Sequence, residues 1–586
     1  VQVRTVNRYV NPLSFQLDIP YATSSYNKYT SATNNNALNL YASYSLNLAN
    51  AHSFALLAGT NQELNKQSGY GANRLNLITP TVPSFSTSTG TTSATDDFNE
   101  YAVSGYFYRV NYGYRNKYLI EITGRYDGSS RFPVGHRFGF FPAVSAGWTI
   151  TEEPFMNEVK NIFSLLKLRG SYGTIGNQVT YKQGTSTQDY YPATPGMNPQ
   201  NASWIDPSTN IVFTTLAAPL LVSNNFTWER IRTTNIGLDW AALNNRLTGS
   251  FDVYKEETLD MLGTGSSLPA IIGAAPPKQN RADLTVNGWD MHALWSDKAN
   301  DKLSYSIGFN LSGRQPAIIT KYNNPSMLLS DYYEGQRLNE IWGFVTQGYF
   351  VTSDFATGAL NDKLINNGSV KQNNGLTPGI AGYRGVLQSP GDIRFADLNG
   401  DSVIFTGQNT VLDPGDRKII GNSTRRLQYG VNGNVAYGNF DMSFFIQGIG
   451  KRDVWISNQV FFPYQNQFAA IYAHQLDYWT PTNTNAYFPR SYANASGPTG
   501  TSQSIQTKYL SNGAYLRVKS LAAGFTVPSA WINSLHIEKA RIFFSGENLF
   551  TFDHLPDGLD PESSNLGSGG IYPFLKKYSF GININF

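Results

Sequence analysis

The stretch YGVNGNVAYGNFDMSFFIQG, residues 429–448, holds two runs in which apolar and polar residues alternate on either side of one tight turn. The apolar positions are Tyr429, Val431, Val435 and Tyr437 before the turn, and Phe440, Met442, Phe444 and Ile446 after it. A period of two places the apolar residues on one face of a β-strand and the polar residues on the other. The stretch therefore predicts a β-hairpin with one face suited to lipid and one suited to a wet lumen.

The same alternation recurs along the chain and predicts about fifteen long strands. We place them at 37–49, 53–66, 101–113, 117–128, 138–151, 164–176, 233–243, 246–261, 286–297, 302–313, 428–437, 440–454, 514–526, 540–551 and 576–586. Most are longer than the usual strand of about five or six residues. They reach the length of about nine to eleven tilted residues that crosses a bilayer.

The connections between these strands alternate between short and long. Short links fall at 50–52, 114–116, 244–245, 298–301 and 438–439. Long polar segments fall near 67–100, 177–232, 262–285, 314–427, 455–513 and 552–575. The alternation is typical of an outer-membrane barrel, which has short periplasmic turns and long extracellular loops. A two-layer sandwich explains each hairpin equally well, but it gives no reason for all long loops to share one end. We therefore expect an all-β fold, a large antiparallel transmembrane β-barrel.

The composition agrees with a chain that is apolar on alternate residues only. Of the 586 residues, 41% are hydrophobic, 14% aromatic and only 15% charged, whereas soluble domains average about 25% charged residues. Mean hydropathy is −0.32, and no run approaches the roughly 18 apolar residues of a membrane helix. The absence of cysteine excludes disulfides and thiolate metal sites. A net charge of +3 gives no indication of nucleic acid as a partner.

The last strand, within KKYSFGININF at 576–586, requires a partner because an uncovered apolar edge strand promotes aggregation. An odd number of strands does not close an antiparallel barrel in the usual way. A sixteenth strand near 11–19 would restore an even number. We otherwise expect the pairing partner, and any signal peptide, to lie outside residues 1–586.

Three parts of the sequence resemble one protein family. They are YLIEITGRYDGSSRFPVGHRFGFFPAVSAGWTITEEPFM at 118–156, DIRFADLNGDSVIFTGQNTVLDPGDRKIIGNS at 392–423, and the set AYLRVKSLAAGFTVP at 514–528, ARIFFSGENLFTF at 540–552 and GLDPE at 558–562. In order and spacing they are similar to the SusC/RagA family of TonB-dependent outer-membrane transporters of Bacteroidetes.

The resemblance implies a barrel of about 22 strands whose lumen is plugged. Residues 1–586 would form its C-terminal part, about 15 to 16 of those strands. The plug and the segment that contacts TonB would then lie outside this sequence. It further implies a surface lipoprotein of the SusD type, TonB-driven uptake of large ligands, and a dimer of transporter–lipoprotein pairs. Oligosaccharides are the expected ligands ahead of peptides, because the loops are nearly neutral and rich in aromatic residues and asparagine.

The loop DLNGD offers a candidate calcium site. Asp397, Asn399 and Asp401 stand at alternate positions, which allows three oxygens to surround Ca²⁺, with the Val403 carbonyl as a fourth. The remaining carboxylate would come from Asp416 or from its neighbour at position 413. The loop departs from an EF-hand because Ser and Gln occupy positions 402 and 408. The alternative is an Asx-turn network that shapes the loop without metal.

No catalytic motif occurs in a suitable context, and the six histidines show no paired spacing. We therefore expect no enzyme activity, no catalytic residue and no required cofactor. Substrate-binding residues are unknown, although loop aromatics are candidates for stacking on sugars or peptide side chains. These are Trp204, Trp342, Tyr332 and Tyr333, for which packing within the loops is the alternative. Trp289 and Trp295 lie near strand ends and are expected in the interfacial aromatic girdle.

Three functions compete. The favoured one is an outer-membrane nutrient importer with a lipoprotein partner. The first alternative is a passive porin, which would lack a plug. The second is a structural or adhesive surface barrel, which would neither accompany a lipoprotein nor bind soluble ligand.

Overall fold

A computed structural model describes residues 2–586 except 11–23, 50, 80, 183–186, 198, 206–207, 210–211, 266–267, 275, 458–460, 463–470, 493–497 and 564–573. For 2–10 it describes the backbone only. Contacts divide the chain into two compact units. The first comprises Val1–Gly147, Ser171–Thr233 and Thr258–Ala282, and the second comprises Trp148–Gly170, Thr234–Glu257 and Asp283–Phe586.

The main feature of the fold is a sheet of 17 strands. Its members are β1 (Gln2–Val10), β2 (Ser25–Leu48), β3 (His52–Leu75), β4 (Thr92–Tyr114), β5 (Tyr118–Ser129), β6 (Phe138–Thr149), β7 (Phe163–Asn177), β10 (Glu229–Ala242), β11 (Leu247–Thr264), β12 (Lys278–Lys298), β13 (Leu303–Arg314), β14 (Ile318–Tyr322), β21 (Leu427–Tyr437), β22 (Phe440–Ile449), β25 (Tyr515–Thr526), β26 (Lys539–Asp553) and β27 (Lys577–Asn585). All fifteen predicted strands are present, and β1 and β14 are additional.

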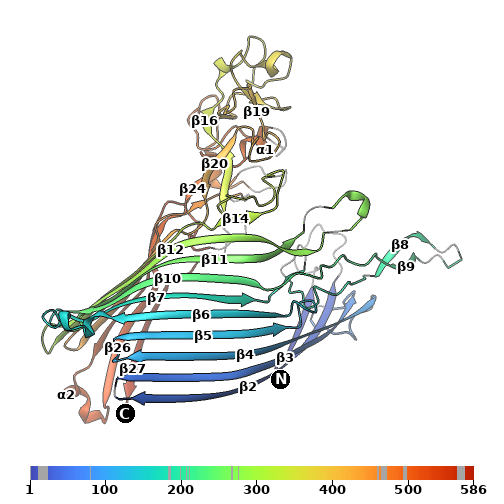
Figure 1. Cartoon of the computed structure of the whole chain (residues 1–586). Coiled ribbons are helices and arrows are strands. Elements are labelled where there is room, and N and C mark those ends of the chain that lie inside the picture. The colour runs from blue at the N-terminus through green and yellow to red at the C-terminus, as the bar shows by residue number, and fades with distance from the viewer. Residues whose placement is uncertain are drawn as a thin grey trace. The chain divides into compact units, whose positions relative to one another are not determined.

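Neighbouring strands pair in antiparallel order (Figure 1). In the first unit, β1 to β5 form a meander in which each strand pairs with the next. In the second unit, β12 pairs with β13, which pairs with β21, and the order continues through β22, β25, β26 and β27. Some neighbours follow one another through a short hairpin turn, as β21 and β22 do, whereas β13 and β21 pair across a long connection.

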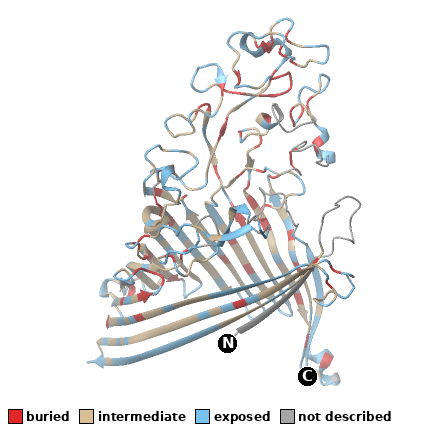
Figure 2. Ribbon diagram, turned by 90° about the vertical axis from the view of Figure 1, so that its right-hand side faces the viewer, coloured by how far each residue is buried: buried red, intermediate tan, exposed pale blue. Residues whose placement is uncertain are grey.

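The register separates an apolar face from a polar face across many strands. Val435 lies opposite Met442, and Phe440 lies opposite Phe525. Directly opposed residues point to the same side of a sheet, so one face collects aromatic and aliphatic side chains. The other face collects polar side chains such as Asp441 and Ser443. Figure 2 shows that much of the sheet is exposed or only half-buried, which suits a sheet whose apolar face meets lipid.

The two ends of the sheet carry different connections. At one end the strands turn within a few residues, as between β12 and β13 or between β21 and β22. The one-turn helices η2 (Ile150–Glu152), η3 (Pro154–Met156), α2 (Ser529–Ile532) and η8 (Asn533–Leu535) also lie in connections at this end. The opposite end carries the long connections. None of the helices in the described part of the chain is long and apolar enough to cross a membrane.

The longest connections fold into structure of their own. They contain β8 (Pro199–Ile205), β9 (Val212–Leu216), η4 (Ala270–Ile272), β15 (Glu340–Phe344), β16 (Thr346–Tyr349), η5 (Thr352–Asp354), η6 (Gln372–Gly375), β17 (Gly382–Tyr383), β18 (Ile393–Phe395), β19 (Val403–Ile404), β20 (Arg417–Asn422), β23 (Asp453–Val454), η7 (Ala473–Leu476), α1 (Pro498–Ser502) and β24 (Ser511–Asn512). We call the two connections that carry β15 to β20 and β23 to β24, residues 340–426 and 450–512, the loop domain.

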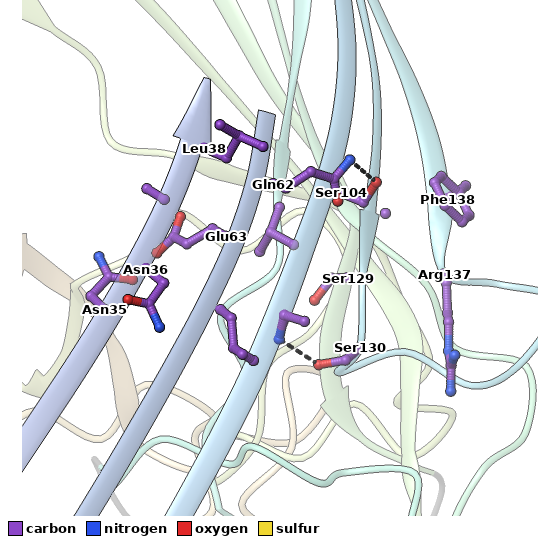
Figure 3. Close-up of a pocket in the computed structure, with 15 residues that line it drawn as sticks. Asn35, Asn36, Leu38, Gln62, Glu63, Ser104, Ser129, Ser130, Arg137 and Phe138 are labelled. Carbon is purple, nitrogen blue, oxygen red and sulfur yellow. Dashed lines mark hydrogen bonds between the residues drawn. The ribbon is translucent and has the colours of Figure 1, made fainter. Parts of the chain in front are cut away.

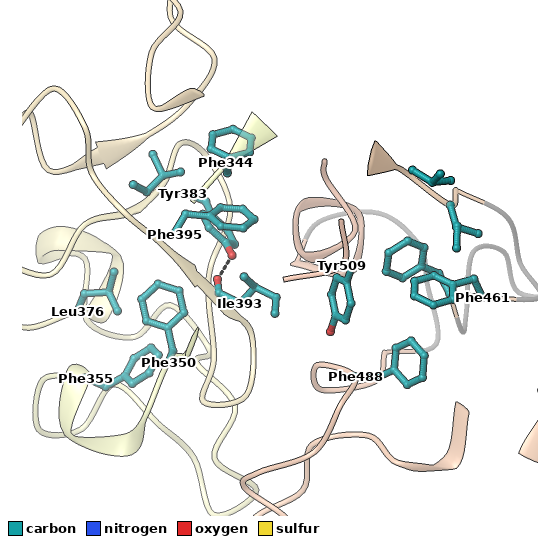
Figure 4. Packing of buried hydrophobic residues seen from close by; sticks show 14 of the residues in the cluster. Phe344, Phe350, Phe355, Leu376, Tyr383, Ile393, Phe395, Phe461, Phe488 and Tyr509 are labelled. Atoms are coloured by element: carbon teal, nitrogen blue, oxygen red, sulfur yellow. Dashed lines mark hydrogen bonds between the residues drawn. The ribbon is translucent and has the colours of Figure 1, made fainter. Parts of the chain in front are cut away.

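The loop domain has its own hydrophobic core (Figure 4). Phe350, Ile393 and Phe395 are fully buried in it, and the ring of Phe395 stacks on Phe344 with centroids 4.7 Å apart. Phe488 comes from a distant part of the sequence and joins the same cluster. A smaller cluster in the first unit consists of Phe132, Phe141, Phe226 and Trp228.

The strand boundaries differ from the prediction where polar residues continue a strand. β2 begins at Ser25, well before the predicted start at 37, and β3 and β4 extend into the segment 67–100. Backbone pairing between β2, β3 and β4 continues through these Asn-, Thr- and Gly-rich residues, although the apolar alternation ends there. The predicted strand near 11–19 lies outside the described residues.

Candidate functional site

Ion pairs between strands line the polar face of the sheet. On β7, the Arg169 guanidinium bonds a carboxylate on each of two further strands. Its Nη1 donates to Oδ1 of Asp252 at 2.6 Å, and its Nε donates to Asp239 at 3.1 Å. An arginine shared by two carboxylates fixes the polar face while it leaves net negative charge on it.

A second pair reaches across a strand. On β26, the Arg541 Nε donates to Oδ1 of Asp441 on β22 at 2.9 Å, although β25 lies between the two strands. Gly524 on β25 permits this reach, because a Cβ at that position would collide with the guanidinium of Arg541. Gly524 therefore has a steric role in the polar face.

A cavity of about 450 Å³ opens on this polar face. Its polar lining comes from the strands β12, β13 and β22 and from the segment before β21, and includes Asp290, His292, Asn310, Arg425 and Gln447. These side chains supply hydrogen-bond donors and acceptors, and they include both an acidic and a basic residue. The cavity therefore suits a polar ligand or a polar protein segment inside a lumen.

The family motif GLDPE is tied to the polar face by buried charges. Arg517 on β25 donates to Asp560 at 2.8 Å and lies 3.2 Å from Glu562. Lys519 and Gln447 also donate to Glu562, each at 2.8 Å. Burial would raise the pKa of Glu562, but the hydrogen bond from Lys519 and the charge of Arg517 lower it below its usual range.

The loop domain contains a buried carboxyl group. Oδ2 of Asp392 accepts a bond from the Ser389 backbone N–H at 2.7 Å and another from the Tyr492 hydroxyl at 3.0 Å. Oδ1 of Asp392 is buried without a hydrogen-bond partner. Burial raises the pKa of Asp392 to about 7, although these two bonds and the charge of Arg490 oppose the shift.

The predicted calcium residues form a compact loop. Oδ1 and Oδ2 of Asp397 accept bonds from the backbone N–H groups of Gly400 and Ser402, at 2.6 and 2.8 Å. Asn399 Nδ2 donates to Asp401 Oδ2 at 3.0 Å. Asn399 Oδ1 and Asp401 Oδ1 each accept a bond from the backbone N–H two residues further on, at 3.1 and 2.7 Å, which is the Asx-turn arrangement that was the alternative to a metal site.

Other contacts keep the calcium interpretation open. Asp416 accepts bonds from the backbone N–H of Leu398 and Phe405, at 2.8 and 3.0 Å. Burial raises the pKa of Asp416, and the negative charges of Asp397 and Asp401 raise it further. Among the described residues, no group of three or more His, Asp or Glu side chains has a geometry that could hold a metal. Calcium binding, including the Val403 carbonyl as a ligand, stays a prediction.

The predicted aromatic residues fall into two sets. Trp204 on β8 and Tyr332 are 64% and 53% exposed and are open to a ligand or a partner. Tyr333 is buried, and its hydroxyl donates to Glu340, which also accepts a bond from the Trp342 indole at 2.9 Å. Tyr333 and Trp342 therefore serve packing within the loops.

A further cavity, of about 820 Å³, lies in the first unit among β2 to β5 and the start of β6 (Figure 3). Gln62 Nε2 donates to Ser104 Oγ at 2.9 Å across β3 and β4. Ser130 Oγ accepts from the Ala102 backbone N–H at 3.0 Å. With Asn35, Glu63 and Arg137 in the lining, the cavity is polar where it meets the loops.

Sequence reasoning did not single out Arg169, Arg541 or Asp392. For the two arginines a signal was present, since each opposes aspartate on the predicted polar face of other strands. Using it requires the register between strands, which a period of two does not supply. Asp392 carries no local signal, because its burial depends on the fold of the whole loop domain.

A protein family described as "TonB dependent receptor-like, beta-barrel" matches residues 2–383. The chain belongs to this family. Its members are outer-membrane transporters and not enzymes, which agrees with the predicted location and with the expected lack of enzyme activity. The family also confirms the predicted β-barrel class.

Curated relatives come from Bacteroidetes. TonB-dependent receptor P3 of Formosa agariphila is 29% identical over 96% of this chain and 53% of its own length. TonB-dependent receptor SusC of Bacteroides thetaiotaomicron is 25% identical over 82% of this chain and 43% of its own length. The chain therefore spans about half the length of the curated relatives it matches.

Solved structures share the fold. The RagAB peptide importer in its "open-open" state aligns with a TM-score of 0.75, at 20% identity, over the whole of this chain and 57% of that chain. The RagAB peptide transporter aligns with a TM-score of 0.73 at 18% identity, over 99% of this chain and 58% of that chain. At these identities the likeness concerns the fold alone. It confirms the resemblance to the SusC/RagA type of barrel.

Proposed function

We propose that this chain forms part of the wall of an outer-membrane importer that takes up large nutrients with energy supplied through TonB. The observation that carries the proposal is the loop domain, in which connections at one end of the sheet share a hydrophobic core. A passive pore has no need of a large folded structure on its loops, whereas capture of a large ligand needs a shaped surface.

In the proposed orientation the short turns face the periplasm and the loop domain lies outside the cell. Outer-membrane barrels have this asymmetry in general. It places the exposed aromatic residues Trp204 and Tyr332 where a ligand arrives.

We further propose an oligosaccharide as the ligand ahead of a peptide. Exposed aromatic side chains next to uncharged polar residues suit the stacking and hydrogen bonding of sugar rings. Peptides are the alternative, since the RagAB structures are those of a peptide importer. The partners in this proposal are a SusD-like surface lipoprotein, the TonB complex through a segment outside this sequence, and a second copy of the transporter–lipoprotein pair.

The first experiment extracts the full-length protein from the outer membrane and measures the intact masses of every chain that accompanies it. The proposal expects a chain far heavier than the 64.9 kDa of this sequence, or a second piece with the plug, together with a lipoprotein. A lone 64.9 kDa chain without companions would favour an open pore.

The second experiment measures uptake of labelled oligosaccharides and peptides by cells with and without the gene. Import through TonB should stop when a protonophore collapses the proton gradient, whereas diffusion through a porin should continue. Adhesion without uptake would favour the structural or adhesive barrel.

A further inference from the structure

A cavity of about 1210 Å³ opens on the apolar face of the sheet in the second unit. Its floor includes Val253, Trp289, Gly313 and Leu427. Trp289 lies opposite Gly313, and Gly313 lies opposite Leu427, so the three point to one side. The ring of Phe251 on β11 lies 6.2 Å from that of Trp289 and places Val253 on the same side.

The floor lies at the upper edge of the apolar band. From Lys298, the last residue of β12, to Trp289 the strand extends about 30 Å at about 3.3 Å per residue. With a tilt of about 40° this is a rise of about 23 Å, close to the roughly 25 Å height of the apolar band in outer-membrane barrels. Trp289 therefore stands at the membrane interface, as expected for the aromatic girdle.

Charged side chains form the walls above this floor. They are the cations Arg314, Arg337, Arg426 and Lys451 and the anions Glu340 and Asp453. The walls also include residues of β15 and β20, the antiparallel pair that begins the loop domain beyond the end of the sheet. The cavity is thus apolar below and carries an excess of positive charge above.

One anion, Glu340, accepts hydrogen bonds from residues close to it in the sequence. Its carboxylate accepts bonds from the Trp342 indole at 2.9 Å, from the Arg337 backbone N–H at 3.3 Å and from the Tyr333 hydroxyl. None of these donors is a cationic side chain. Glu340 therefore makes no ion pair with the cations of the cavity.

The other anion, Asp453, is held by one cation. Its Oδ2 accepts bonds from Arg426 Nη2 at 2.9 Å and from the Asn422 backbone N–H at 2.8 Å. Asp453 therefore neutralises the charge of Arg426 within the protein. Arg426 nevertheless keeps its Nε buried without a hydrogen-bond partner.

Two of the remaining three cations of the wall have no such partner. Within the described residues, neither the Arg337 guanidinium nor the Lys451 ammonium makes a hydrogen bond or ion pair, and both residues are exposed. Arg314, by contrast, pairs with Glu256 at 3.5 Å. Arg337 and Lys451 thus give the cavity its unneutralised charge.

We propose that this cavity binds the phosphorylated headgroup of a lipid from the outer leaflet, through Arg337 and Lys451. Arginine and lysine form strong charge-assisted bonds to phosphate, and basic pockets beside a membrane bind anionic headgroups. The acyl chains would pass over Val253, Trp289 and Leu427. This inference rests on the orientation in the proposed function, which places the cavity at the outer leaflet.

The apolar floor of the cavity favours a lipid over a free anion as the ligand. Inorganic phosphate would use the cations alone, and it would gain nothing from an indole and two aliphatic side chains beneath them. The lipid uses both parts of the cavity, because its headgroup and its chains join at the level where the floor and the walls meet.

The test counts bound lipid by native mass spectrometry of the full-length protein in detergent. The protein is titrated with purified monophosphorylated lipid A and, separately, with the same lipid after removal of its phosphate. We expect the phosphorylated lipid to bind the wild type, and the double variant R337E/K451E to bind it at least about tenfold more weakly, since two attractive charges become repulsive. The dephosphorylated lipid should show the weak binding of the variant in both proteins.

Two controls accompany this variant. Lys321→Glu changes an exposed cation of β14 that does not line the cavity, and it should keep wild-type binding. Arg337→Lys keeps the positive charge and should retain most of the lipid binding. A variant that fails to fold would lose the heat-modifiable migration that barrels show in gels, and in that case Arg337→Gln and Lys451→Gln replace the double variant in the comparison.

Three results would overturn the proposal. The first is equal lipid binding by wild type and double variant. The second is full competition by inorganic phosphate at millimolar concentration, which would identify a small-anion site. The third is a changed oligomeric state with unchanged lipid count, which would identify an interface between copies. Ligand uptake is measured in the same strains, so failure of this proposal is distinguished from failure of the importer proposal.

Discussion

Asp392 shows how one residue can couple the loop domain to pH. Its side chain is fully buried, and only one of its two carboxylate oxygens has hydrogen-bond partners. A protonated carboxyl tolerates this environment better than a carboxylate, and this preference is the physical meaning of a pKa near 7.

The loop domain should therefore lose stability as pH rises. The pKa of Asp392 is raised from 3.8 to about 7 in the folded state, so the folded state holds the proton more tightly than the unfolded state does. The resulting stabilisation is complete below about pH 4 and is lost as pH rises through about 7, with a loss of about 3 kcal/mol between pH 5 and pH 8. Hydrogen exchange of loop-domain amides at the two pH values measures it, and Asp392→Asn should flatten the dependence. A wild type that becomes more protected at pH 8 would contradict this assignment.

Asp397 offers a second test at the residue scale. Replacement by alanine leaves the backbone N–H groups of Gly400 and Ser402 without their acceptor, which should cost about 1–2 kcal/mol of loop-domain stability. Thermal unfolding with a chelator measures this cost without metal. Addition of Ca²⁺ to the wild type then separates the two interpretations, because only a calcium site raises the unfolding temperature, and Asp397→Ala should abolish that rise.

At the scale of the element, the period-two alternation predicted fifteen of the 17 strands of the sheet and missed β1 and β14. Each strand presents apolar side chains to lipid and polar side chains to the lumen. The alternation within its own residues therefore predicts its position. Boundaries were predicted less well where strands leave the apolar band. In β2 and β4, polar residues continue to pair through the backbone alone, and β14 is too short to show a period.

The two faces of β22 should respond differently to the same substitution. Phe444 lies on the apolar face opposite Gly433, and the adjacent Ser443 lies on the polar face and lines a cavity of about 780 Å³. Phe444→Arg should cost about 2–4 kcal/mol near the middle of the membrane, whereas Ser443→Arg should be tolerated. Urea unfolding in lipid vesicles compares the two variants, and equal losses would contradict the assignment of the faces.

The ion pairs of β7, β10 and β11 should be coupled. Arg169→Gln leaves Asp239 and Asp252 without their shared cation and should destabilise the barrel by about 1–3 kcal/mol. Asp252→Asn in the same background should recover part of that loss, because it removes one of the two negative charges. A double variant that is as unstable as the sum of the single variants would show that the groups do not interact.

At the scale of the whole molecule, sequence patterns predicted the sheet far better than the candidate site. The loop domain has no period, and its core joins Phe344 to Phe488 and Tyr509 across long stretches of sequence. Such contacts follow from the complete fold and not from any local run of residues. The resemblance to transporters indicated the class of function. The ion-paired residues of the polar face could be identified only once the register between the strands was known.

The most direct test of the account measures which end of the sheet lies outside the cell. The sequence contains no cysteine, so a single introduced thiol is the only one in this part of the protein. Thr357→Cys places it on an exposed part of the loop domain, and Ala299→Cys places it in the short turn between β12 and β13. In intact cells a membrane-impermeant maleimide should label the thiol at 357 and not the thiol at 299, and opening of the outer membrane should make 299 reactive. Labelling of both positions in intact cells, or of 299 alone, would contradict a barrel that spans the outer membrane with its long loops outside.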